Sequence, residues 1–276
     1  MKLDSIKYLE SSEHFFCISF YEGKLDWIKS LNPSKYIVYN KSNLNLSNEI
    51  KSIKIKNVGY NLYSYLIYII DNYENLPESI VFCKNNIFNR HIEKNLFLKL
   101  IKRKIYTPLE DISLKLKEIE SLILSGHNFN EINTSWYKYN YERLYFANFN
   151  EFYQFIFKTS NIPLFLEFAP GGNYLVKKEN ILLRSKNFYK NLKIFISHSQ
   201  FSCESHFLER SLNTIWNSSI PTNKKMEINI SKNSLNKLER KCTFMKNKEN
   251  KLIEKIKQKI LIILGRYYIK LLRSCL

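Results

Sequence analysis

Three residues that could do chemistry lie close together in one segment: His206 and Glu209 can transfer protons, and Arg210 can pair with a phosphate or with Glu209. The apolar pattern of residues 205–216 predicts a helix, and His206 and Glu209 are three positions apart, so both should face the same way. A carboxylate beside a histidine can accept the proton of an attacking hydroxyl group. Glu209 is therefore the first candidate for a general base, with His206 as its companion. The alternative is a buried Glu209–Arg210 pair that braces the helix.

Polar residues also follow the apolar run SIVFC, residues 79–83. Lys84, Asn85 and Asn86 come directly after it, and His91 lies a few residues further on. A lysine at the end of a buried strand can neutralise a phosphate as a fixed charge, and His91 is a second candidate for proton transfer. The alternatives are that Lys84 is a solvated strand end and that His91 is structural.

A Pro170-Gly171-Gly172 turn stands directly before a strand-like run that contains Tyr174. The chain has only 6 glycines, so two in succession indicate a constraint on the backbone. Two glycines allow positive φ angles, or let the backbone approach a ligand closely. An ordinary tight turn is the other interpretation.

The elements that must position these residues follow from the apolar runs. Four strands are predicted at residues 15–20, 36–39, 50–55 and 79–83, and a buried helix at residues 60–73. This order predicts an α/β domain with a mainly parallel sheet, whose carboxyl edge is the usual place for a ligand. Further on we expect extended residues 163–168, a strand at 174–176, and helices at 178–192 and 205–216.

Charge divides the chain of 276 residues unevenly, although the total is +18. The last 53 residues, from Lys224, hold fifteen Lys or Arg and four Glu, which is a net charge of +11. We therefore predict an α/β domain over residues 1–222 and a basic, helical extension over residues 223–276. The 5 cysteines form no C-x-x-C pair, which favours a reducing, cytoplasmic compartment. No signal peptide or transmembrane run is expected.

The end of the chain has the pattern of an amphipathic helix. Apolar residues recur at helical spacing through residues 246–276, with lysines and arginines between them. The pattern is typical of a helix that lies in the interface of an anionic membrane. The alternative is that the apolar stripe packs on the body or on a second subunit.

Three blocks of sequence resemble a glycosyltransferase-like domain family that has long been catalogued as of unknown function. The first block is Asn57-Val58-Gly59 with residues 65–77 and Val81-Phe82. The second is Pro170-Gly171-Gly172 with Tyr174, Val176 and Phe188-Tyr189, and the third is His206 to Arg210 with Trp216. A weaker block near the N-terminus is Tyr21 with residues 25–28 and 39–41. They occur in the family's order over roughly residues 15 to 217.

The resemblance implies a GT-A architecture, a Rossmann-like sheet that binds a nucleotide-sugar donor at its carboxyl edge. From the resemblance and the residue chemistry together, we assign donor binding to Tyr21, Asn40, Asn57, Gly59, Lys84, Asn85 and Asn86. In the same way we assign acceptor binding to Gly171, Gly172, Tyr174 and Arg210, and catalysis to Glu209, His206 and His91. The aromatic run Trp136, Tyr137, Tyr139 and Tyr141 is expected either to stack on sugar rings or to belong to the core.

The chain departs from the family's pattern at several polar positions. Gly23-Lys24 replaces an acidic pair, Tyr60-Asn61 replaces Arg-Glu, and Lys84-Asn85 replaces Gln-Gly. A divalent cation, Mg²⁺ or Mn²⁺, is the cofactor of many GT-A enzymes, but the 4 Asp of this chain form no Asp-x-Asp motif, and no metal ligand is assigned. Either the donor specificity differs or the activity is reduced.

We therefore expect an enzyme, a glycosyltransferase that builds a surface polysaccharide or a lipid-linked glycan, cytoplasmic and peripheral on the inner face of the membrane. A non-catalytic scaffold of the same fold is the first alternative. A basic nucleic-acid-binding protein is the second, although the positive charge gathers in the tail and no nucleic acid is expected as a partner.

Overall fold

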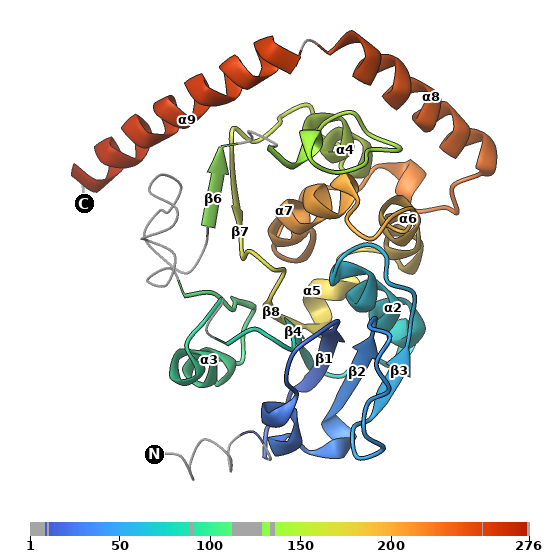
Figure 1. Ribbon diagram of the computed structural model, residues 1–276, viewed down its shortest axis with the longest axis vertical. Coiled ribbons are helices and arrows are strands. Elements are labelled where there is room, and N and C mark those ends of the chain that lie inside the picture. Colours follow the sequence, from blue (N-terminus) through green and yellow to red (C-terminus); the bar gives the residue numbers. More distant parts are fainter. Residues whose placement is uncertain are drawn as a thin grey trace.

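The computed structural model describes residue 9 and residues 11–88, 91–111, 129–132, 136–249 and 251–274. Their centre is a six-stranded sheet of order β3-β2-β1-β4-β8-β5, covered by helices (Figure 1). The first four strands are β1 (Phe15–Phe20), β2 (Tyr36–Asn40), β3 (Ser52–Lys54) and β4 (Ser79–Lys84). All four run parallel, as the apolar runs predict, and β4 is central.

The sheet is mixed rather than wholly parallel. Strand β8 (Tyr174–Lys177) pairs antiparallel with β4 and with β5 (Thr107–Pro108). A separate two-stranded ribbon joins β6 (Phe129–Ile132) to β7 (Phe165–Phe168). The protein is therefore an α/β protein with a mostly parallel, Rossmann-like sheet.

The side chains of the strands alternate between two cores. In β4, Ile80 and Phe82 face a core that contains helix α2 (Leu62–Asn72), whereas Val81 and Cys83 face a core that contains α3 (Lys94–Ile101). Phe82 stacks on Trp216 at 5.4 Å between ring centroids and also touches Tyr65 of α2. Strands β1, β2 and β4 are buried on both faces, which is why they read as unbroken apolar runs.

The remaining helices of the body cover the α2 side of the sheet. They are α4 (Phe149–Ile156), α5 (Lys178–Leu182), α6 (Lys186–Ile196) and α7 (Cys203–Asn217). The single helix predicted at residues 178–192 is in fact α5 and α6. Ser185 separates them, because its hydroxyl accepts the backbone N–H of Phe188 and caps α6. The short 3₁₀ turns are Asp26–Ser30, Pro33–Lys35, Tyr73–Asn75, Trp136–Tyr139 and Lys224–Met226.

Two helices form the C-terminal extension, α8 (Lys232–Lys248) and α9 (Lys251–Ser274). Figure 1 shows them arching over the body, with α9 beside β6. The segment before α8 packs on the body, since the side-chain amide of Asn191 donates to Met226 O and Ile228 O at 3.0 and 2.8 Å. Within the described ranges, no helix combines the length and the apolar character that crossing a membrane requires.

Candidate functional site

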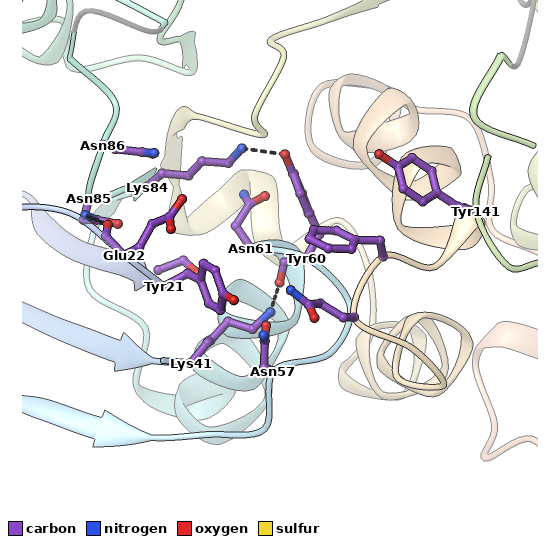
Figure 2. Close-up of a pocket in the computed structure, with 13 residues that line it drawn as sticks. Tyr21, Glu22, Lys41, Asn57, Tyr60, Asn61, Lys84, Asn85, Asn86 and Tyr141 are labelled. Atoms are coloured by element: carbon purple, nitrogen blue, oxygen red, sulfur yellow. Dashed lines mark hydrogen bonds between the residues drawn. The ribbon is translucent and has the colours of Figure 1, made fainter. Parts of the chain in front are cut away.

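A cavity of about 340 Å³ opens at the carboxyl edge of the parallel strands (Figure 2). Its walls come from the segments that follow the strands and from two loops on the opposite side. The lining residues are Ser19, Tyr21, Glu22, Lys41, Asn57, Tyr60, Asn61, Lys84, Asn85, Asn86, Tyr141, Gln200 and Phe201.

The strand order explains why a cavity forms here. Strand β1 has β2 on one side and β4 on the other, so the connections leave the sheet in opposite directions from this point. Open α/β sheets bind ligands in the crevice that such a switch creates. The cavity lies where a small ligand would be expected from topology alone.

Two buried lysines give the cavity a positive character. Lys84, the last residue of β4, is 8% exposed, and its ammonium lies 3.2 Å from the Tyr60 hydroxyl and 4.3 Å from the centre of the Tyr60 ring. Its backbone N–H donates to Asn173 Oδ1 at 3.2 Å. Lys84 is thus a fixed charge at a strand end, held by an aromatic ring.

Lys41 is the second buried lysine, one residue beyond β2 and 5% exposed. Its amino group donates to Val58 O at 2.6 Å and to Tyr60 O. Burial, and then the charge of Lys84, lower the pKa of Lys41 from 10.5 to about 7. Lys41 therefore braces the loop before α2 and is poised to gain a proton when an anion enters the cavity.

Tyr60 has an unusual backbone. Its φ is 53°, a left-handed conformation that is an outlier for an aromatic residue. The preceding Gly59 also has a positive φ, and the two N–H groups donate to Ser199 O and Gln200 O at 2.9 and 3.0 Å. The strained pair joins the loop before α2 to the loop before α7, and it holds the Tyr60 ring over Lys84. Such strain is found mostly at functional sites.

Asparagine side chains shape the rest of the edge. Asn85 Nδ2 donates to Glu22 O at 2.8 Å and so holds the loop that carries Tyr21 and Glu22. Asn61 Nδ2 donates to Gly171 O at 2.7 Å. Asn40, by contrast, binds within its own turn, where Nδ2 donates to Leu44 O at 2.8 Å, and it is not among the lining residues.

The Pro-Gly-Gly turn lies directly behind this wall. Gly171 and Gly172 have φ angles of 87° and 61°, so both glycines occupy conformations that other residues rarely adopt. A Cβ on Gly171 would lie 2.8 Å from the His91 ring, and one on Gly172 would lie 2.8 Å from a Leu62 methyl group. The turn packs against protein on both sides, which explains why two glycines are needed.

Glu209 fixes this turn from the other side. Its Oε1 accepts the N–H of Gly171 at 2.7 Å, and its Oε2 accepts a hydrogen bond from Arg210 at 3.0 Å. Arg210 also pairs with Glu131 and lies over the ring of Tyr137, 4.1 Å from its centre. The bracing ion pair that the sequence left open is therefore present.

The two candidate histidines are also buried behind the cavity wall. His206 stacks between Tyr137 and Tyr141 with centroid distances of 4.9 and 5.0 Å. Burial, and then the charges of Arg210 and Lys84, hold the pKa of His206 well below 6.5, so the ring is neutral at pH 7. His91 lies under Gly171, with Nδ1 3.9 Å from Glu110 Oε2.

The structure thus arranges the predicted residues in two layers. The donor candidates Tyr21, Asn57, Lys84, Asn85 and Asn86 line the cavity. The catalytic and acceptor candidates form a second layer, connected to the first by the Asn61–Gly171–Glu209 hydrogen bonds. Tyr174 is in the core, where its hydroxyl accepts the Ala169 N–H at 2.6 Å.

Sequence reasoning missed several lining residues. Lys41 could have been predicted, because it follows a strand just as Asn85 does. Tyr60 and Asn61 enter the sequence analysis only as departures from the pattern of the resembled family. Glu22, which supplies the carboxylate in the described lining of the cavity, was also missed. Gln200 and Phe201 have no sequence signal, because a hydrogen-bonded contact between distant loops brings them here. In the described part of the chain, no cluster of three His, Cys, Asp or Glu could hold a metal ion.

Fold and site together define an α/β protein with a ligand-sized, positively charged cavity at the switch point of a Rossmann-like sheet. The family described as "Protein of unknown function (DUF3431)" matches residues 18–229. This is well over half of the chain, and the chain belongs to that family. No curated protein and no solved structure matches the chain.

Proposed function

We propose that the protein binds a nucleotide-activated sugar in the cavity and transfers the sugar to a glycan or lipid-linked acceptor. The proposal includes the GT-A architecture, whose donor site lies at the carboxyl edge of the sheet. The observation that carries it is the pair of buried lysines, Lys41 and Lys84, at the switch point. A diphosphate is an anion that suits a cavity lined by two buried lysine side chains.

The other lining groups suit the rest of such a ligand. Amide side chains at Asn57, Asn86 and Gln200 can donate to and accept from ribose and sugar hydroxyl groups. The rings of Tyr21 and Phe201 offer flat surfaces for a base or a pyranose. In this arrangement Lys84 supplies the charge that a divalent cation supplies in many GT-A enzymes.

Glu22 is the group best placed to accept a proton from an acceptor hydroxyl. It is exposed on the loop after β1, and Figure 2 shows its carboxylate directed into the same space as the Lys84 side chain. Glu209, in contrast, already accepts hydrogen bonds from Gly171 and Arg210. We therefore assign the base to Glu22 and a positioning role to Glu209.

A non-catalytic scaffold of the same fold is the second candidate. It is favoured by the engagement of Glu209 in structural contacts and by the burial of His206 and His91. Such a protein would bind the nucleotide sugar and form no product.

Calorimetry with nucleoside diphosphates, nucleotide sugars and uncharged nucleosides tests the proposal. We expect a diphosphate to bind and the matching nucleoside to bind far more weakly. Lys84→Met should weaken diphosphate binding about 10-fold or more, the scale of one charge-assisted contact. Lys56→Met is the matched control, because Lys56 is exposed on the neighbouring loop and does not line the cavity.

An acceptor screen then separates an enzyme from a scaffold. Glu22→Gln should abolish transfer without weakening diphosphate binding, because it removes the proposed base and takes a negative charge out of the cavity. If no phosphorylated nucleotide binds, the proposed function is rejected. If a nucleotide sugar binds but no acceptor yields a product, the scaffold is the better description.

A further inference from the structure

Helix α9 carries a row of exposed apolar side chains. Ile256, Ile260, Ile263 and Tyr267 are 49%, 51%, 51% and 66% exposed, and Leu264 at their edge is 58% exposed. At about 100° per residue, the first four fall within about 60° of one another around the helix axis. We refer to these five residues as the outer stripe.

The outer stripe points away from the body. Gly265 is buried and Leu261 is half-buried, and the helix contacts β6. Gly265 lies about 170° around the axis from the centre of the stripe. In the described part of the chain the helix therefore rests on the body by the opposite side, and the outer stripe is exposed.

The start of α9 is fixed rather than free. Glu249, two residues before it, accepts a bidentate pair of hydrogen bonds from Arg143 at 2.9 and 3.0 Å. Lys138 lies 3.4 Å from the same carboxylate, and Lys246 donates to Arg143 O at 2.9 Å. These contacts anchor the end of α8 to the body directly before α9 begins.

The helix is strongly basic. Its residues include seven Lys or Arg and one Glu, a net charge of +6. By helical register, positions 255, 259, 266, 270 and 273, all Lys or Arg, fall on an arc beside one edge of the stripe. The side chain of Lys259 is exposed. An apolar row with cations along its edge matches a surface that is apolar inside and negative outside.

We propose that α9 docks the protein on an anionic lipid surface, with the outer stripe inserted between headgroups and the lysines and arginines beside it on lipid phosphates and carboxylates. The inference is independent of the proposed function, because α9 lies outside residues 18–229, the region that the family shares. A helix in the interface plane needs one apolar side and a basic flank, and α9 has both.

A lipid surface fits this helix better than a second copy of the chain or a partner protein does. A second copy of the chain would bring a second helix of charge +6 against the first, which is repulsive. A protein that wraps a basic amphipathic helix needs access all round it, but the Gly265 side is taken by the body. A flat membrane needs only the outward side.

Co-sedimentation of the full chain with vesicles tests the proposal. We expect binding to phosphatidylcholine vesicles that contain phosphatidylserine, little binding to phosphatidylcholine alone, and release by salt. Ile256→Ser, Ile260→Ser and Ile263→Ser together should lower the partition coefficient by about 10-fold or more. Lys259→Gln alone should lower it about five-fold on anionic vesicles.

The matched control replaces three apolar residues elsewhere that are at least as exposed, as Leu44→Ser, Leu164→Ser and Ile228→Ser, which are 59%, 60% and 65% exposed. It should bind like the unaltered protein, and circular dichroism should show native helix content in both variants. The proposal is overturned if the unaltered protein does not sediment with anionic vesicles at low salt. Equal binding of the outer-stripe variant, or equal binding to neutral vesicles, also overturns it. So does a dimer, seen by analytical ultracentrifugation without lipid, that the outer-stripe variant abolishes.

Discussion

Lys41 gives the protein a pH dependence of stability that can be worked out in advance. Its side chain is 5% exposed, and its pKa in the folded protein is about 7, against 10.5 in an exposed lysine. Between these two values the unfolded chain binds a proton that the folded chain does not. The free energy of unfolding must therefore rise with pH across this window. The cost of burying the lysine is fully present below pH 7.

The magnitude follows from the size of the shift. A difference of 3.5 between 10.5 and 7 corresponds to about 5 kcal/mol at about 1.4 kcal/mol per pH unit. Integrated only from pH 7 to pH 9, the gain is about 2 kcal/mol. Lys41→Met removes the titrating group and should remove this gain, at the loss of hydrogen bonds to Val58 O and Tyr60 O.

Urea unfolding at pH 7, 8 and 9 measures the effect as a difference between the two proteins. The difference matters because burial also raises the pKa of Cys17 and Cys83, which lowers stability as pH rises towards 9. This contribution is the same in both proteins and cancels. Lys56→Met, which removes an exposed lysine, should follow the unaltered protein.

The reasoning is refuted if the free energies of unfolding of the unaltered protein and of Lys41→Met change in parallel from pH 7 to pH 9, because Lys41 would then stay protonated in the folded protein. If the reasoning holds, an anion in the cavity should also be bound with proton uptake, and its affinity should fall by up to about 10-fold per pH unit above pH 7.

Three further predictions concern the layers behind the cavity. Lys84→Met should raise the pKa of His206, because the Lys84 charge is one of the causes that lower it; an NMR titration of the His206 ring that is unchanged would contradict this. Gly172→Ala should lower the free energy of unfolding, measured with urea, by about 1–3 kcal/mol. The reason is that φ is 61° and the new methyl group would lie 2.8 Å from the side chain of Leu62, the first residue of α2. An unchanged free energy of unfolding would show that the turn relaxes. Glu209→Gln should cost about 2 kcal/mol by weakening a buried pair with Arg210, and an unchanged free energy of unfolding would show that the pair does not brace α7.

Much of the fold was predictable because burial on both faces makes a strand read as an apolar run. Strands β1, β2 and β4 begin and end within one residue of their predicted limits. The direction of β8 was not predictable, since antiparallel pairing with β4 is set by packing between distant segments. Helix α2 begins at Leu62 rather than at residue 60, because Tyr60 takes a positive φ that sequence patterns assign to glycine.

The candidate site was predictable on one side only. Residues that follow β1 and β4 lie where the topological rule puts them, so Tyr21, Lys84 and Asn85 were found. Lys41 was passed over for its neighbour Asn40, because β2 extends one residue further than expected. The opposite wall could not be predicted, because backbone hydrogen bonds from the strained Gly59–Tyr60 pair bring it into place.

Four of the six positions that depart from the resembled glycosyltransferase pattern line the cavity, namely Tyr60, Asn61, Lys84 and Asn85, and this bears on whether the site is functional. Tyr60 and Lys84, two of these positions, touch each other, with the ammonium 4.3 Å from the ring centre. Lys41 and Lys84 are buried together, and Lys84 is one of the two causes that lower the pKa of Lys41. A site that had lost its ligand would gain stability by replacing either lysine with an apolar residue. Two buried lysines beside a strained tyrosine therefore support the proposal of an anionic ligand.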